Sequence, residues 1–136
     1  MATTRTSTIF GDAKLADTVT PITAATTLND NATGNVFTLG LATGVAINLP
    51  APVSGFKAKF VVTAAFATTA YTIVAPTAVM YGGAIVNSVN VPCAAKATIN
   101  FSATAETIGD WVELTSDGTK YFVSGVGTAA GAITFP

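Results

Sequence analysis

The stretch Asp110-Trp-Val-Glu-Leu-Thr-Ser-Asp-Gly-Thr-Lys-Tyr-Phe-Val-Ser124 decides the fold class. Apolar and polar residues alternate on both sides of Asp117-Gly118, which is typical of two β-strands joined by a two-residue turn. Such a turn needs positive φ at both central residues, and the register that follows pairs Leu114 with Tyr121 on a core face. The same register pairs Val112 with Val123, Thr115 with Lys120, Glu113 with Phe122, and Trp111 with Ser124.

The second face of this hairpin carries Trp111 and Phe122 beside Glu113, so it is only partly apolar. Two explanations stay open for Trp111: another subunit covers it, or it lies under a loop of its own domain. Trp111 and Phe122 are therefore candidate interface residues.

The rest of the chain repeats the pattern of short alternating runs separated by Gly, Pro, Asn and Asp. No stretch has helical spacing of its apolar residues, so the sequence predicts an all-β fold, an antiparallel β-sandwich of jelly-roll-like form. The expected strands are Val36–Leu41, Val45–Leu49, Phe56–Phe66, Tyr71–Ala75, Ala84–Val91, Ala97–Phe101, Trp111–Thr115, Thr119–Ser124 and Ala132–Phe135.

The first part of the chain has a different character. Residues 1–20 show little alternation, and we expect them to form an extended arm. The arm carries mixed charges, which suit a polar protein surface and add four candidate interface residues: Arg5, Asp12, Lys14 and Asp17. A turn-rich lead-in follows over Leu28–Gly34, so the expected division is residues 1–34 for arm and lead-in and 35–136 for the sandwich.

Composition limits the possible functions. The 136 residues are 50% hydrophobic and only 10% charged, which suits a surface that contacts other protein subunits. Six basic against seven acidic residues leave no surplus to neutralise a phosphate backbone, so we expect no nucleic-acid partner. The chain has no histidine, and its single cysteine cannot form an internal disulfide. We therefore expect no enzyme activity and no cofactor.

The possible chemical motifs have simpler explanations. Glu106, Asp110, Glu113 and Asp117 form the only acidic group, but they run along a hairpin, whereas Ca²⁺ needs six to eight converging oxygens. We expect them to be solvated strand and turn positions, and we expect no metal site. Cys93 is expected to be a buried, inert thiol. No apolar stretch has the length of a membrane span or the form of a signal peptide, so no membrane partner is expected.

Two blocks of the chain resemble a known class of proteins. The first runs from Asn35-Val-Phe-Thr-Leu39 through Ala46-Ile-Asn-Leu-Pro-Ala-Pro-Val-Ser-Gly-Phe-Lys-Ala-Lys-Phe-Val-Val62 to Tyr71-Thr-Ile-Val74. The second is Gly109–Gly125, with a closing Ala132-Ile-Thr-Phe135. Together they resemble virion structural proteins of tailed bacteriophages, especially capsid decoration (cement) proteins and related fibre modules. Such hairpins often carry a Trp in the returning strand, where this chain has Tyr121-Phe122.

The resemblance implies β-sandwich modules, commonly homotrimers, that are made in the host cytoplasm and seated on the capsid surface of the virion. It implies no active site, and the partner that it implies is the major capsid protein. One alternative is a tail fibre or baseplate module that binds host-surface carbohydrate. Another is a lone carbohydrate-binding domain, which the 9% aromatic content disfavours.

Overall fold

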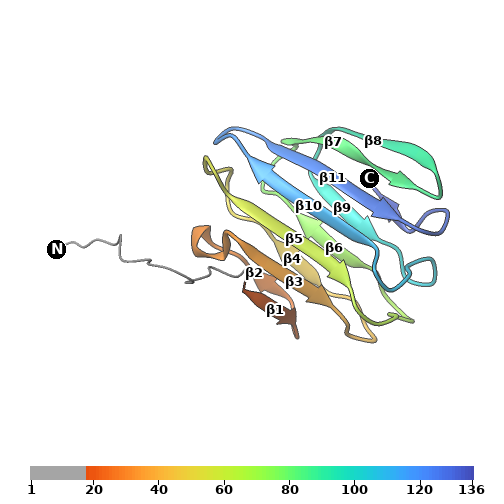
Figure 1. Ribbon diagram of the computed structural model, residues 1–136. Coiled ribbons are helices and arrows are strands. Elements are labelled where there is room, and N and C mark those ends of the chain that lie inside the picture. Colours follow the sequence, from red (N-terminus) through yellow and green to blue (C-terminus); the bar gives the residue numbers. More distant parts are fainter. Residues whose placement is uncertain (1–17) are drawn as a thin grey trace, which may run out of the picture.

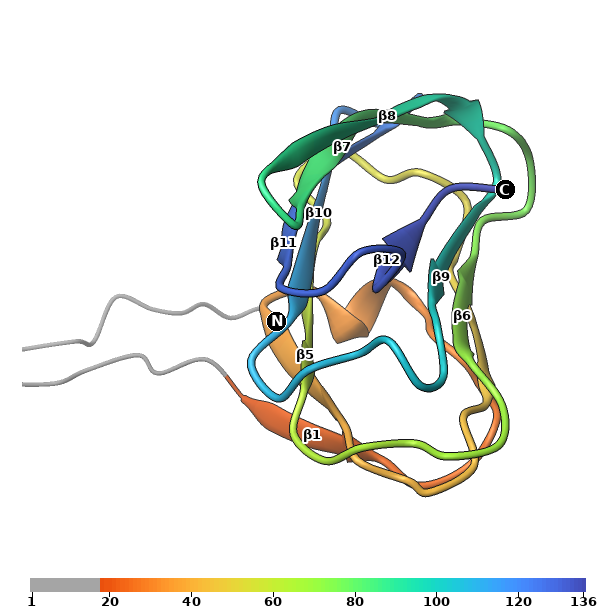
Figure 2. The ribbon, with the colours of Figure 1, turned by 90° about the vertical axis from the view of Figure 1, so that its right-hand side faces the viewer.

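Within the predicted strand Phe56–Phe66, every second residue from Phe56 to Val62 faces the core. The computed structural model describes residues 18–136, and in it Phe56, Ala58, Phe60 and Val62 are at most 2% exposed. These side chains lie between two packed sheets, which Figure 2 shows edge-on as two layers. The prediction of an all-β sandwich is confirmed.

The larger sheet has seven strands and faces the viewer in Figure 1. In spatial order its strands are β1 (Val19–Ile22), β3 (Asn35–Leu39), β5 (Lys57–Val62), β10 (Trp111–Ser116), β11 (Tyr121–Gly127), β7 (Met80–Val86) and β8 (Val89–Lys96). The five-stranded sheet follows the order β12 (Ile133–Thr134), β9 (Thr98–Phe101), β6 (Tyr71–Val74), β4 (Ala46–Asn48) and β2 (Thr26–Thr27).

The expectation of an antiparallel, jelly-roll-like sandwich is wrong in its strand directions. From β1 to β6 the chain passes back and forth between the two sheets, and each strand pairs in parallel with the next strand of its own sheet. A further parallel pair joins β11 to β7, and the remaining five pairings are antiparallel. Because each early connection crosses to the other sheet, successive strands of one sheet run in the same direction.

The boundary of the sandwich lies earlier than expected. Strands β1 and β2 fall within the predicted arm and lead-in, and each joins the edge of a sheet. Ile22 of β1 is only 6% exposed, so the first strand contributes to the core. The lead-in contains the short 3₁₀ turn Asp30–Ala32, which Asn29 caps by accepting a hydrogen bond from the Asn31 N–H at 3.0 Å. Residues 1–17 of the predicted arm lie outside the described residues.

The hairpin from Trp111 has the predicted faces but a different register. Leu114 pairs with Val123, so the pairing is shifted by two residues and the loop is four residues long. The shift arises at Asp117, whose Oδ1 accepts hydrogen bonds from the N–H groups of Thr119 and Lys120, both at 2.8 Å. These bonds hold the loop open as an Asx turn. Gly118 has positive φ as expected, at +98°, whereas Asp117 does not.

A second hairpin replaces the single strand expected over Ala84–Val91. Strands β7 and β8 pair tightly around Asn87 and Ser88, which have φ of 49° and 66°. This is the two-residue turn with positive φ that the sequence placed at Asp117-Gly118. Asn tolerates this conformation, but the Asn-Ser pair lacks the glycine that would have marked the turn.

Candidate interaction surface

The outward side of the seven-stranded sheet, here called the outer face, carries an apolar row across four neighbouring strands. Val61 of β5 pairs with Trp111 of β10, Trp111 pairs with Val126 of β11, and Val126 pairs with Ile85 of β7. Val61 and Trp111 are partly buried, whereas Val126 and Ile85 are 43% and 49% exposed. These four residues, the apolar row, span roughly 14 Å at the usual spacing of strands.

Aromatic rings on the outer face are covered in part by lysine. The Nζ atom of Lys59 lies 4.7 Å from the centre of the Trp111 ring, and that of Lys120 lies 5.2 Å from the centre of the Tyr81 ring. Both arrangements are cation–π contacts. They hold two ammonium groups over the sheet. Phe122 of β11 is 45% exposed and pairs directly with Tyr81 of β7, so the two aromatic side chains are neighbours on the outer face.

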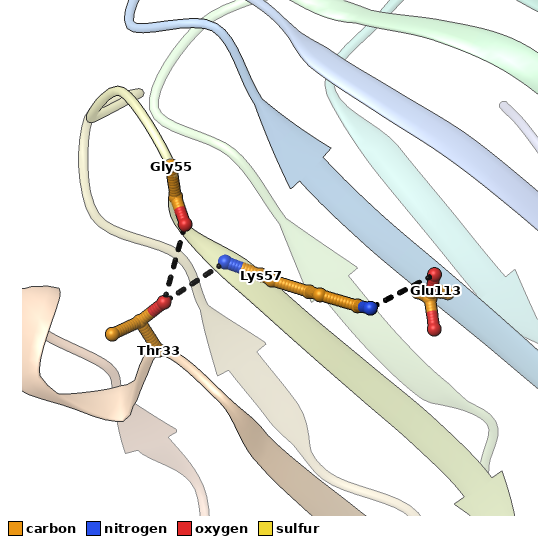
Figure 3. Close-up of polar contacts among 4 residues, drawn as sticks. All are labelled: Thr33, Gly55, Lys57 and Glu113. Atoms are coloured by element: carbon orange, nitrogen blue, oxygen red, sulfur yellow. Dashed lines mark hydrogen bonds and ion pairs between the residues drawn. The ribbon is translucent and has the colours of Figure 1, made fainter.

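A polar cluster lies at the start of β5, four residues before Val61 of the apolar row; Figure 3 shows its four residues. Thr33 Oγ1 donates to the Gly55 carbonyl at 3.5 Å and accepts from the Lys57 N–H at 3.1 Å. The Lys57 ammonium reaches Glu113 Oε1 of β10 at 3.9 Å. The Lys57 side chain is 58% exposed, so this ion pair contributes little to stability. A hollow of about 80 Å³ lies here, and Lys57, Lys59 and Glu113 are among its lining residues.

The structure places both described interface candidates on the outer face. Trp111 and Phe122 lie there, but in different rows, because Phe122 pairs with Thr115 and Trp111 with Val126. The expected neighbours, Glu113 for Phe122 and Ser124 for Trp111, are corrected by the shifted register. The other four candidates, Arg5, Asp12, Lys14 and Asp17, lie outside the described residues. Whether another subunit covers the outer face stays a prediction.

Sequence reasoning missed two exposed members of the apolar row. Val126 lies beyond the end of the expected strand Thr119–Ser124, but β11 continues to Gly127. Ile85 lies in the strand expected over Ala84–Val91, for which no partner strand was predicted; in the structure its strand, β7, pairs with β11. The alternation Phe122, Ser124, Val126 was the available signal, since it continues the outward positions of β11.

The acidic group does not converge on one point. Asp110 is 1% exposed, so the expectation of a solvated position is wrong for this residue. Its Oδ1 accepts from the N–H and hydroxyl of Thr128 at 2.8 and 2.9 Å, and its Oδ2 accepts from the Thr107 N–H at 2.9 Å. Glu106 Oε1 accepts from the Phe66 N–H at 2.8 Å. In residues 18–136 no group of three or more metal-ligating side chains comes together.

Three further titratable groups have pKa values that differ from their ordinary values. The N–H groups of Thr119 and Lys120 hold the pKa of Asp117 below its ordinary value. Burial raises the pKa of Tyr121 to about 12, and its hydroxyl donates to the Pro50 carbonyl at 2.9 Å. Burial also raises the pKa of the Cys93 thiol, which is 2% exposed as predicted, and so favours its protonated form.

A groove of about 210 Å³ lies at the open edge of the sandwich, between β1 and β2. Ile22, Leu28 and Phe37 are among its apolar lining residues, and the connection between the two strands, residues 23–25, also lines it. No helix among the described residues is long and apolar enough to cross a membrane.

No protein-family model, no curated protein and no solved structure matches the chain.

Proposed function

We propose that this chain is a capsid decoration protein that binds the outside of a tailed-phage head as a homotrimer and stabilises it. The observation that carries the proposal is the outer face, where an apolar row with two half-exposed members crosses four strands. Exposed apolar surface of this kind marks protein–protein contacts.

The two sequence blocks that resemble phage virion proteins contribute directly to this surface. The first block contains β5, which carries Lys57, Lys59 and Val61, and the second forms β10 and most of β11. Strand β5 pairs with β10, so the resemblance falls on neighbouring strands of one face. The major capsid protein is the proposed partner. A protein that binds only the assembled shell stabilises it by mass action.

A tail-fibre module that binds host carbohydrate is a second candidate. The outward side of the five-stranded sheet favours it, because that side presents neutral amides and hydroxyls such as those of Asn48, Thr72 and Asn100. Against it, a sugar platform is built from open aromatic rings, whereas on the outer face Lys59 lies over Trp111 and Lys120 over Tyr81, which leaves Phe122 as the exposed ring. The geometry thus favours a protein partner over a sugar.

The proposal is tested with phage heads that lack the chain. Purified protein is added, the heads are sedimented and bound protein is counted against capsid subunits, while light scattering after size exclusion gives the oligomeric mass. We expect saturable binding, three times the mass of one chain, and DNA retention to higher temperature. Heads that bind no protein would refute decoration, and a monomer at micromolar concentration would refute the trimer.

A further inference from the structure

Among residues 18–136, the strands at the free edges of both sheets are unsuited to pairing with a strand of another protein. In the seven-stranded sheet the edge strands β1 and β8 each contain a proline, Pro21 and Pro92, which has no N–H to donate. In the five-stranded sheet the edge strands β12 and β2 have only two residues each. A partner is therefore expected to contact a face of the sandwich and not to extend a sheet.

The two outward sides differ sharply in charge. The outer face carries the ammonium groups of Lys57, Lys59 and Lys120 and, on its strands, a single carboxylate, Glu113. Asp117 lies in the loop beside Lys120, where backbone N–H groups engage its carboxylate. The outward positions of the five-stranded sheet carry no charge: they are Thr27, Ala46, Asn48, Thr72, Val74, Thr98, Asn100 and Thr134.

This charge pattern distinguishes between two possible occupants of the outer face. If the same face of a second copy packed against it, lysines would meet lysines around an apolar centre, and like charges in an interface are costly. A surface with carboxylates around an apolar patch would instead pair with the ammonium groups of Lys57, Lys59 and Lys120. Lys59 and Lys120 are already positioned by the rings beneath them, so less side-chain freedom is lost on binding.

We propose that the outer face docks onto an acidic protein surface, whose carboxylates meet these lysines and whose apolar centre covers the apolar row. The inference deepens the proposed function and rests on it for the identity of the partner, the capsid shell. The available area supports a specific contact. Seven strands of about six residues present on the order of 600 Å², close to the ~800 Å² that each partner contributes to a standard interface.

The experiment measures binding of variants to phage heads that lack the protein, as a function of NaCl concentration. The double variant K57Q/K120Q removes two positive charges from the outer face. The matched control A46E/N48E makes the same change in net charge at two exposed positions of the opposite sheet. A third variant, I85T/V126T, changes the apolar row without changing charge. Circular dichroism and Trp111 fluorescence verify that each variant is folded.

We expect K57Q/K120Q to bind about tenfold more weakly with a flatter salt dependence, I85T/V126T to bind more weakly at every salt concentration, and A46E/N48E to bind like the wild type. Two outcomes would overturn this inference and leave decoration intact. In one, the wild type binds and only A46E/N48E impairs binding. In the other, the wild type binds and no variant changes binding. A change in oligomeric mass confined to the outer-face variants would make the outer face a self-contact and also overturn it. Failure of the wild type to bind would refute the proposed function itself.

Discussion

Replacing the buried carboxylate of Asp110 tests how the two loops at one end of the sandwich are held. Asp110 precedes β10 and joins the loop at Thr107 to the loop that follows β11 at Thr128 through three hydrogen bonds. Asp110→Ala leaves two backbone N–H groups and one hydroxyl without this acceptor. Thr107 and Thr128 are themselves exposed, so water replaces part of the loss. The low end of the usual range, about 1 kcal/mol per bond, then gives about 3 kcal/mol.

The isosteric variant Asp110→Asn separates hydrogen bonding from packing. Its amide oxygen still accepts from Thr128, but its NH₂ group faces the Thr107 N–H, where two donors meet. We expect an intermediate cost of about 1–2 kcal/mol. Urea unfolding followed by the fluorescence of Trp111, the only tryptophan, gives the free energy, and circular dichroism controls for the nearness of the probe.

A cost below about 0.5 kcal/mol for Asp110→Ala, within the range of ordinary surface substitutions, would refute this reasoning. An equal cost for Asn and Ala would show that the charge of the carboxylate, and not the set of three acceptor contacts, holds the loops. A ΔΔG of 3 kcal/mol corresponds to a fall in melting temperature of about 10 °C for a chain of this size, which calorimetry can check.

Four further outcomes are expected. Gly118→Ala should cost roughly 1–2 kcal/mol because φ is +98° while space for a Cβ exists, and a melting curve superimposable on that of the wild type would contradict it. Gly82→Ala should cost more, about 3 kcal/mol, because its Cβ would overlap the Val123 carbonyl oxygen across β7 and β11; chemical denaturation ranks the two variants. The lowered pKa of Asp117 means that its stabilising contribution is full above the unfolded pKa of about 3.9 and is lost as pH falls through the folded value. Asp117→Asn should therefore flatten the decline of stability below about pH 4, and parallel pH curves would contradict this. Glu113→Gln removes the exposed ion pair with Lys57 and should change the unfolding free energy by less than about 0.5 kcal/mol. A larger loss would contradict the expectation that this ion pair contributes little to stability.

The sequence was sufficient to predict the core of the larger sheet but not the course of the chain. The alternation from Phe56 to Val62 predicts which side chains are buried, because the pleat sends successive residues to opposite faces. It carries no information on strand direction. Parallel pairing of β1, β3 and β5 left no repeat to detect, since the paired residues Val19, Val36 and Lys59 are separated by unequal lengths of chain.

The candidate surface was predictable in part for a related reason. Trp111 and Phe122 were correctly placed on one face because a register error of two residues leaves every side chain on its own side of the sheet. Their neighbours were not predicted, because these depend on the exact register and on β7, whose turn at Asn87-Ser88 lacks a glycine. The buried role of Asp110 depends on loops that meet only in three dimensions, and no local pattern reveals it.

Electron cryomicroscopy of the virion that carries this chain tests the proposed role most directly. The account predicts sandwich-shaped densities in groups of three on the outside of the head, with the face that bears Trp111 and Lys59 turned towards the capsid shell. Density found only at the tail would contradict decoration and favour the carbohydrate-binding fibre module. A virion without the chain in head or tail would contradict both proposals.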